Sequence, residues 1–298
     1  MKKRLSINLN KKSTVELTNV SSGSLIVGVY EGPFTKELKK IDEVSNGQLK
    51  KLRKLGELNG KLGQGNYLPA LTGIRAQRTY LVGCGRKGKK LTRQDAIKIL
   101  SKIVSAAISS KASSSFISVP KLNVTGEGDD WIIQQLAYLC ENNCYTYDAK
   151  LNKKNQKKIS LKRVSLTIDS PIPDTKINRN IKVGQAIGRG SNAAKDLGNL
   201  PGNVCTPSYL AKESRSAANK YSSLKCTVLG EKQMKKLGMD CLLSVGNGSA
   251  QESKLITLNY QGGKRGDQPY VIVGKGITFD TGGISLKPGA AMDEMKFD

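Results

Sequence analysis

The sequence predicts an α/β protein of two domains, and three observations support this. Short β-branched runs that end in glycine alternate with amphipathic helical stretches through the first half of the chain. This alternation is typical of a largely parallel sheet covered by helices. Residues 169–174 then form a stretch with two prolines and few apolar residues, which is typical of a domain boundary. We therefore expect one α/β domain over residues 1–170 and another over residues 171–298, a division that the length of 298 residues allows.

The first half contains four runs with the composition of strands and two with the periodicity of helices. The predicted strands span residues 24–30, 79–84, 115–119 and 164–168. The first helix follows Thr92-Arg-Gln-Asp95, which resembles a capping box with Asp at its third helical position. The second helix spans residues 129–144. The core-facing residues expected in these helices are Ala96, Leu100, Ile103, Val104, Ala107, Ile108, Ile132, Ile133, Leu136 and Cys140.

The second half follows a similar pattern. Residues 178–197 predict a connecting helix, although Gly184, Gly188 and Gly190 weaken it. A short helix is expected over residues 207–221. Three strands of a second sheet are expected over residues 226–229, 255–258 and 271–273, and the last of them leads into a glycine-rich loop.

The charge of the chain is strongly positive, at +25 from 49 basic and 24 acidic residues. Such an excess raises the prospect of a nucleic-acid partner. The basic residues are scattered, however, and their clusters at residues 1–4, 86–90 and 153–158 are short. Aromatic residues make up only 5%, which leaves little for single-stranded bases to stack on. A solvated lysine-rich surface is therefore the favoured interpretation, and nucleic-acid binding is an alternative that is not favoured.

Histidine is absent from the sequence, which excludes several classes of catalytic site. A Ser-His-Asp triad, a Cys-His pair and a His-ligated zinc site all require that residue. The six cysteines have no paired Cys-x-x-Cys spacing and predict structural thiols in a reducing compartment. The sequence contains no apolar signal region and no run of 18 apolar residues. We expect a cytoplasmic protein without membrane spans.

Residues 271–298 carry the chemistry, because carboxylates and lysines follow the last predicted strand on a glycine-rich loop. Two hard cations about 3.5–4 Å apart bind carboxylate oxygens and can activate water, so Asp280 and Asp298 are candidate ligands. Lys275 is a third candidate, since burial and a nearby dication favour its neutral amine. Lys287 would stay charged and face a developing oxyanion. On spacing alone, a solvated turn is the commoner outcome.

The complete string is more specific than its spacing. Residues 273–288, Val-Gly-Lys-Gly-Ile-Thr-Phe-Asp-Thr-Gly-Gly-Ile-Ser-Leu-Lys-Pro, precede Met292-Asp-Glu-Met-Lys-Phe-Asp298. Together they closely resemble the metal-binding signature of the leucyl aminopeptidase (cytosol aminopeptidase) family of two-metal exopeptidases. Residues 196–210, 230–239 and 244–249 extend the resemblance. It covers most of the chain from about Val183 onward and, more weakly, the N-terminal half.

The resemblance assigns roles to individual residues. Lys275 and Asp298 correspond to ligands of the tightly held metal, and Asp280 corresponds to a carboxylate shared by both metals. Lys287 corresponds to the catalytic lysine that polarises the scissile carbonyl. Met295 falls where the family lines its side-chain pocket.

The resemblance also implies a fold, an activity and partners. The fold would be a macro-like α/β domain followed by a zinc-exopeptidase-like catalytic domain that is incomplete at Asp298. The activity would be removal of N-terminal residues, leucine-like ones preferred, from peptide substrates by a homohexamer that uses two divalent ions, Mn²⁺ or Zn²⁺. The family also uses a downstream Asp-x-Glu-x-Arg segment for its remaining ligands and for bicarbonate. Because that segment is not in this sequence, we expect an incomplete site and an inactive 298-residue chain, and a non-catalytic basic DNA-binding or scaffold protein is the alternative.

Overall fold

The computed structural model describes residues 5–10, 16–147, 154, 158–264 and 266–297. The chain divides into two compact units, Met1–Ala193 and Ala194–Asp298. The division falls within helix α5 (Asp174–Asn199). The boundary expected between residues 170 and 171 lies just before this helix and stays a prediction. Strands and helices mix in both units, which confirms the α/β class.

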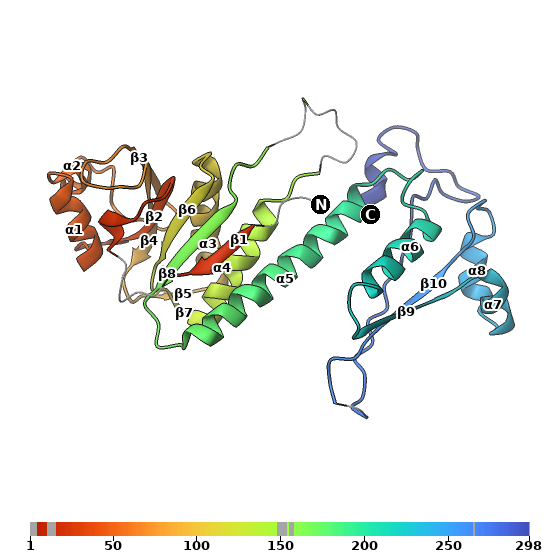
Figure 1. The fold of residues 1–298 in the computed structure, drawn as a ribbon. Coiled ribbons are helices and arrows are strands. Elements are labelled where there is room, and N and C mark those ends of the chain that lie inside the picture. Colours follow the sequence, from red (N-terminus) through yellow and green to blue (C-terminus); the bar gives the residue numbers. More distant parts are fainter. Residues whose placement is uncertain (1–4, 11–15, 148–153, 155–157, 265, 298) are drawn as a thin grey trace. The chain divides into compact units, whose positions relative to one another are not determined.

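A six-stranded sheet forms the centre of the N-terminal unit (Figure 1), in the order β1-β8-β6-β2-β4-β3. Every neighbouring pair is parallel except β3 with β4. The four predicted strands are confirmed, and the two edge strands of the sheet are additional to them. The strands are β1 (Ser6–Leu9), β2 (Ser24–Glu31), β3 (Gly65–Pro69), β4 (Arg78–Arg86), β6 (Ser114–Val119) and β8 (Arg163–Ile168). Strands β5 (Lys90–Leu91) and β7 (Asn123–Val124) pair separately.

Helices cover both faces of this sheet. On one side, α3 (Arg93–Ser109), α4 (Asp129–Asn143) and α5 share an apolar cluster with alternate residues of the strands, such as Ile26 and Leu166. On the other side, α1 (Lys36–Val44) and α2 (Gln48–Lys54) pack on a second cluster, together with the short helix η2 (Leu17–Asn19). The second cluster includes Leu25 and Val27, because successive strand residues point to opposite faces.

Helix α3 begins at the predicted capping box. The Thr92 hydroxyl accepts a hydrogen bond from the Asp95 amide at 3.1 Å, and the Asp95 carboxylate accepts one from the Thr92 amide at 3.4 Å. Both amides would otherwise lack a partner at the start of the helix. Nine of the ten predicted core-facing residues of α3 and α4 are buried; the tenth, Ile108, is partly buried. The helical periodicity therefore predicted the buried faces well.

Arg53 at the end of α2 ties that helix to the carboxyl end of β2. Its guanidinium donates to the carbonyl oxygen of Leu58 at 3.2 Å, to that of Tyr30 at 3.3 Å and to that of Gly32. The same group lies 3.8 Å from the centroid of the Phe34 ring, an arrangement that favours a cation. Burial lowers the pKa of Arg53, but the carbonyl oxygens accept hydrogen bonds from its charged form.

The glycines of α5 have two different surroundings. A methyl group on Gly184 would lie 2.2 Å from the carbonyl oxygen of Gln134, and one on Gly188 would lie 2.6 Å from Cβ of Glu141. Both positions are buried against α4, whereas Gly190 is exposed with open space around it. The two buried glycines therefore permit a close approach of α4 and α5, which lie side by side in Figure 1. Two of the three glycines that weaken the local helical pattern, Gly184 and Gly188, thus make a tertiary contact.

The second unit contains a two-stranded antiparallel sheet of β9 (Leu224–Leu229) and β10 (Leu255–Tyr260). Its helices are α6 (Pro207–Ala218), α7 (Glu231–Lys236), α8 (Asp240–Gly246) and the short η4 (Glu294–Phe297). The helix predicted over residues 207–221 and the strands predicted over residues 226–229 and 255–258 are confirmed. Among the described helices of the chain, none combines the length and the apolar character that a membrane crossing needs.

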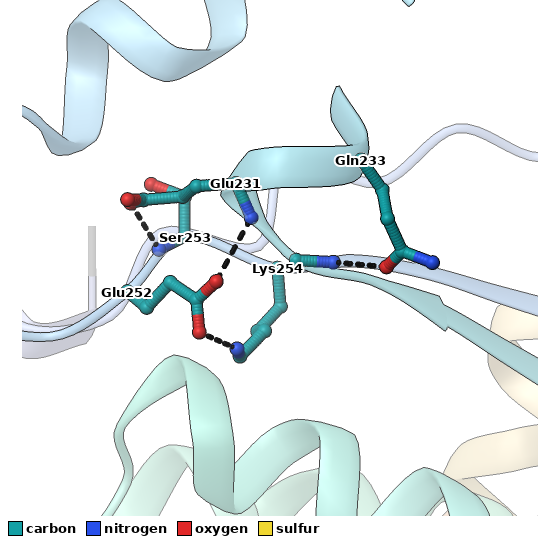
Figure 2. A network of polar contacts seen from close by, with 6 residues as sticks. Glu231, Gln233, Glu252, Ser253 and Lys254 are labelled. Carbon is teal, nitrogen blue, oxygen red and sulfur yellow. Dashed lines mark hydrogen bonds and ion pairs between the residues drawn. The ribbon is translucent and has the colours of Figure 1, made fainter. Parts of the chain in front are cut away.

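A polar network anchors α7 to the residues that lead into β10 (Figure 2). The Glu231 amide donates to the Glu252 carboxylate at 2.9 Å, and the Glu231 carboxylate accepts from the Ser253 amide at 2.8 Å. Lys254 forms an ion pair with the other Glu252 oxygen. The first amides of a helix need acceptors, and here a carboxylate from another segment supplies one. The network therefore fixes where the chain enters β10.

The α5 glycines provide a test of the packing. Gly184→Ala should lower the free energy of unfolding by about 1–3 kcal/mol, because its methyl group overlaps the Gln134 carbonyl. Gly190→Ala is the matched control and should raise it by up to about 1 kcal/mol through helix propensity alone. Urea denaturation followed by circular dichroism measures both. Equal effects of the two substitutions would contradict close packing at Gly184.

Candidate metal centre

Residues 270–280, which follow β10, form no helix or strand and are mostly exposed. Tyr270, Val271, Ile272 and Val273 form no strand, and the exposed fractions of Ile272 and Val273 are 95% and 91%. The strand predicted over residues 271–273 is therefore wrong. A strand needs a neighbour for its amides and carbonyls, and among the described residues β10 pairs with β9 alone.

A tight hairpin over residues 281–287 follows. The Lys287 amide donates to the Thr281 carbonyl at 2.9 Å, and an antiparallel bridge joins Gly282 to Leu286. Gly282 has a φ of +105°, and a methyl group there would lie 2.3 Å from the Ser285 carbonyl oxygen. Only glycine fits this position without strain. The Gly-Gly pair in the sequence indicates a turn, but it does not predict this bridge.

The hairpin brings two predicted site residues together. One Asp280 oxygen accepts a hydrogen bond from the Gly282 amide at 2.8 Å, and the other lies 3.9 Å from the Lys287 ammonium nitrogen. Their side chains are 47% and 31% exposed, respectively. The backbone amide orients the carboxylate, and the lysine balances its charge. Asp280 and Lys287 therefore form a partly shielded pair of opposite charges.

The other predicted site residues have a different status. Lys275 lies on the exposed segment between Val273 and Asp280, and no hydrogen bond or ion pair links it to another described residue. Met295 is partly buried in η4, and Asp298 lies outside the described residues. Within the described ranges, no group of three or more His, Cys, Asp or Glu residues could hold a metal. The roles assigned to these three residues, like those of Asp280 and Lys287, remain predictions.

A second loop of the same unit contacts this region. A methyl group on Gly202 would lie 2.5 Å from Cβ of Phe279, the residue before Asp280. Gly202 belongs to the turn between α5 and α6, whose Val204 amide donates to the Pro201 carbonyl at 2.9 Å. The turn at Gly202 therefore packs against the residue that precedes Asp280. The Pro-Gly pair in the sequence indicates a turn, but its partner was not predictable from spacing.

Comparisons with known proteins identify the family of this chain. Residues 192–298 match the catalytic domain of the Cytosol aminopeptidase family, and residues 26–154 match the N-terminal domain of the same family. The chain belongs to the cytosol aminopeptidase family. A probable cytosol aminopeptidase of Alkalilimnicola ehrlichii is 41% identical over 94% of this chain and 56% of its own length. The chain thus spans little more than half of this curated relative.

Two solved structures share the fold of this chain. A mutant of tomato leucine aminopeptidase has a TM-score of 0.71 at 21% identity, over 88% of this chain and 52% of that chain. The bottromycin maturation enzyme BotP, determined in complex with Mn, has a TM-score of 0.67 at 23% identity, over 93% of this chain and 53% of that chain. The cytosol aminopeptidase family is metal-dependent.

The two adjacent glycines of the hairpin give a matched test of its geometry. Gly282→Ala should open the hairpin, because the left-handed backbone costs a non-glycine residue about 1–2 kcal/mol and the methyl group overlaps Ser285. Protection of the Lys287 amide from hydrogen exchange should then fall by about tenfold. Gly283→Ala should leave it unchanged, since nothing lies within 4 Å of the added methyl group. Unchanged protection in Gly282→Ala would contradict the hairpin.

Proposed function

We propose that this chain is part of a metal-dependent aminopeptidase, a hydrolase that removes N-terminal residues, leucine-like ones preferred, from peptides. The observation that carries the proposal is the pairing of Asp280 with Lys287 on one hairpin, within the part of the chain that matches the family's catalytic domain. The relatives' description as cytosol aminopeptidases supports a cytoplasmic location. The family matches do not favour a non-catalytic DNA-binding or scaffold protein.

The residues of the site include the type of ligand atom that a divalent cation binds. Carboxylate oxygens are the ligands that hard divalent ions prefer, and Asp280 presents one oriented carboxylate. Lys275, Asp280 and Asp298 would hold the ions, with Asp280 shared. When bound, two divalent ions, Mn²⁺ or Zn²⁺, supply an activated water and a Lewis acid. The remaining ligands, and the arginine that would hold bicarbonate, belong to a downstream segment, and by resemblance the complete protein is a homohexamer.

Lys287 and Met295 act on the substrate in this proposal. The carbonyl oxygen of the scissile peptide bond gains negative charge as the tetrahedral intermediate forms. Nζ of Lys287, a charged donor, hydrogen-bonds that oxygen and stabilises the charge more strongly in the transition state than in the ground state. The hairpin holds Lys287 in place through its own backbone amide. Met295 contacts the apolar side chain of the residue to be released.

The catalytic role of Lys287 can be tested in a chimera. Residues 1–298 are continued by the remaining part of the Alkalilimnicola ehrlichii relative, and release of N-terminal leucine is assayed. Lys287→Ala should lower kcat by about 10²–10³, because an oxyanion loses its charged donor. Lys236→Ala, on the exposed surface of α7, should leave kcat unchanged. An inactive parent chimera would contradict the proposed activity, and equal kcat values would remove Lys287 from the mechanism.

Asp280→Asn should have a different signature in the same chimera. A shared carboxylate that loses its charge weakens both ions, so bound metal, measured by elemental analysis, should fall together with activity. Asp293→Asn is the control, since Asp293 is an exposed residue of the same loop with no assigned role. Full metal occupancy in Asp280→Asn would show that Asp280 is not the shared ligand.

A further inference from the structure

One half of a sheet face in the N-terminal unit is polar. Alternate residues of β8 belong to the apolar cluster under α3, α4 and α5. The residues between them, beginning with Arg163 and Ser165, therefore point to the opposite face. The apolar cluster under α1 and α2 on that face includes Phe116 of β6 but no residue of β8 or β1. Beyond Phe116, the sheet thus presents polar side chains.

A cavity of about 490 Å³ lies on this polar half. Four serine hydroxyls, two asparagine amides and the Arg163 guanidinium contribute to its wall, and Phe116 is the one aromatic ring among the described residues of the wall. Strand register places Arg163 beside Ser114, and Ser165 beside Phe116. The volume falls within the range of about 300–1,000 Å³ that small-molecule sites occupy.

The charge of the cavity comes mainly from Arg163. Glu16 also lines it, but its carboxylate forms an ion pair with Lys40 and accepts a hydrogen bond from the Asn19 amide group at 2.6 Å. These contacts lower the pKa of the Glu16 carboxyl group, and Lys40 makes the largest contribution through its hydrogen bond and its charge. Arg163 forms no ion pair with any described residue. Among the described residues, the Arg163 guanidinium is thus a positive charge of the wall that no carboxylate pairs with.

The hydroxyls of the wall keep hydrogen-bonding capacity for a ligand. Ser114 accepts from the Ser22 hydroxyl at 3.4 Å and from the Gly23 amide at 3.2 Å, which leaves its own O–H to donate. Thr167 follows Ser165 on the same face of the sheet but does not line the cavity. Its hydroxyl is buried and has no hydrogen-bond partner among the described residues. Buried polar atoms are normally paired, so this face contains more hydrogen-bonding groups than the described chain uses.

We propose that this cavity binds a small polyhydroxylated phosphate monoester. The phosphate would pair with Arg163, whose planar fork matches phosphate oxygens. Sugar-like hydroxyls would exchange hydrogen bonds with the serines and asparagines. The described part of the wall holds one aromatic ring, so it offers no pair of rings between which a nucleobase could stack. This site is independent of the proposed peptidase function and uses none of its residues.

Calorimetric titration of the 298-residue chain tests the proposal with ribose 5-phosphate as the probe. Ribose and inorganic phosphate, the two components of this probe, are titrated separately for comparison. Ribose 5-phosphate should bind saturably and at least about tenfold more tightly than either half. Arg163→Gln should weaken it by about tenfold or more, since hydrogen bonds between charged groups are among the strongest. Lys162→Gln removes the same charge one residue away, outside the cavity, and should change the affinity less than twofold.

Three results would overturn the proposal. Ribose 5-phosphate that does not bind, or binds no better than inorganic phosphate, would exclude a polyhydroxylated ligand. Equal losses of affinity for ribose 5-phosphate in Arg163→Gln and Lys162→Gln would show that diffuse surface charge, and not the cavity, binds the phosphate. Circular dichroism checks that the variants fold, and Ser165→Ala is a second test in case Arg163→Gln misfolds. Ser165→Ala should weaken ribose 5-phosphate severalfold and leave inorganic phosphate unaffected, and an unchanged affinity for ribose 5-phosphate would count against the site.

Discussion

Strand β2 is buried along almost its whole length, and the rest of the N-terminal unit depends on that burial. It pairs in parallel with β4 on one side and β6 on the other, so its backbone groups are satisfied within the sheet. Its side chains are apolar on both faces, which requires a layer of helices on each. Helices α3, α4 and α5 supply one layer, and α1 and α2 supply the other. Gly184 and Gly188 let α5 lie close to α4 in the first layer. Hydrogen bonds from Arg53 to carbonyl oxygens hold α2 in the second layer.

Local composition predicted the first sheet well and failed at the end of the second. Residues 24–30 and 271–273 are both β-branched runs that end near glycine, yet β2 is buried and Ile272 is 95% exposed. The difference is the neighbour: β2 has one on each side, and residues 271–273 have none among the described residues. Strand propensity describes a side chain that fits a pleated, half-buried surface. Whether that surface exists is a non-local property that a short run cannot reveal.

In the candidate site too, the residues could be named from the sequence, but their arrangement in space could not. Asp280 and Lys287 were singled out by the resemblance of residues 273–298 to the family signature, because spacing alone favours a solvated turn. Their mutual geometry was not predictable, since it depends on the φ of Gly282 and on the bridge to Leu286. The contact of Gly202 with Phe279 joins residues far apart in sequence, which no spacing rule anticipates. The roles of all the candidate site residues, Lys275 and Asp298 included, rest on the sequence alone.

The ion pair between Asp280 and Lys287 suggests how the proposed site changes when metal binds. Both side chains are partly exposed, and such a pair contributes about 1 kcal/mol or less. A divalent ion carries twice the charge of Lys287 and coordinates carboxylate oxygens directly, so it would win the competition for Asp280. The side chain of Lys287 would then lose its partner, while its backbone would keep its position, because the hydrogen bond from its amide to Thr281 does not involve the ammonium group. On the proposed function, the same event that loads the metal would release the lysine to face the substrate carbonyl, and the hairpin would need no rearrangement.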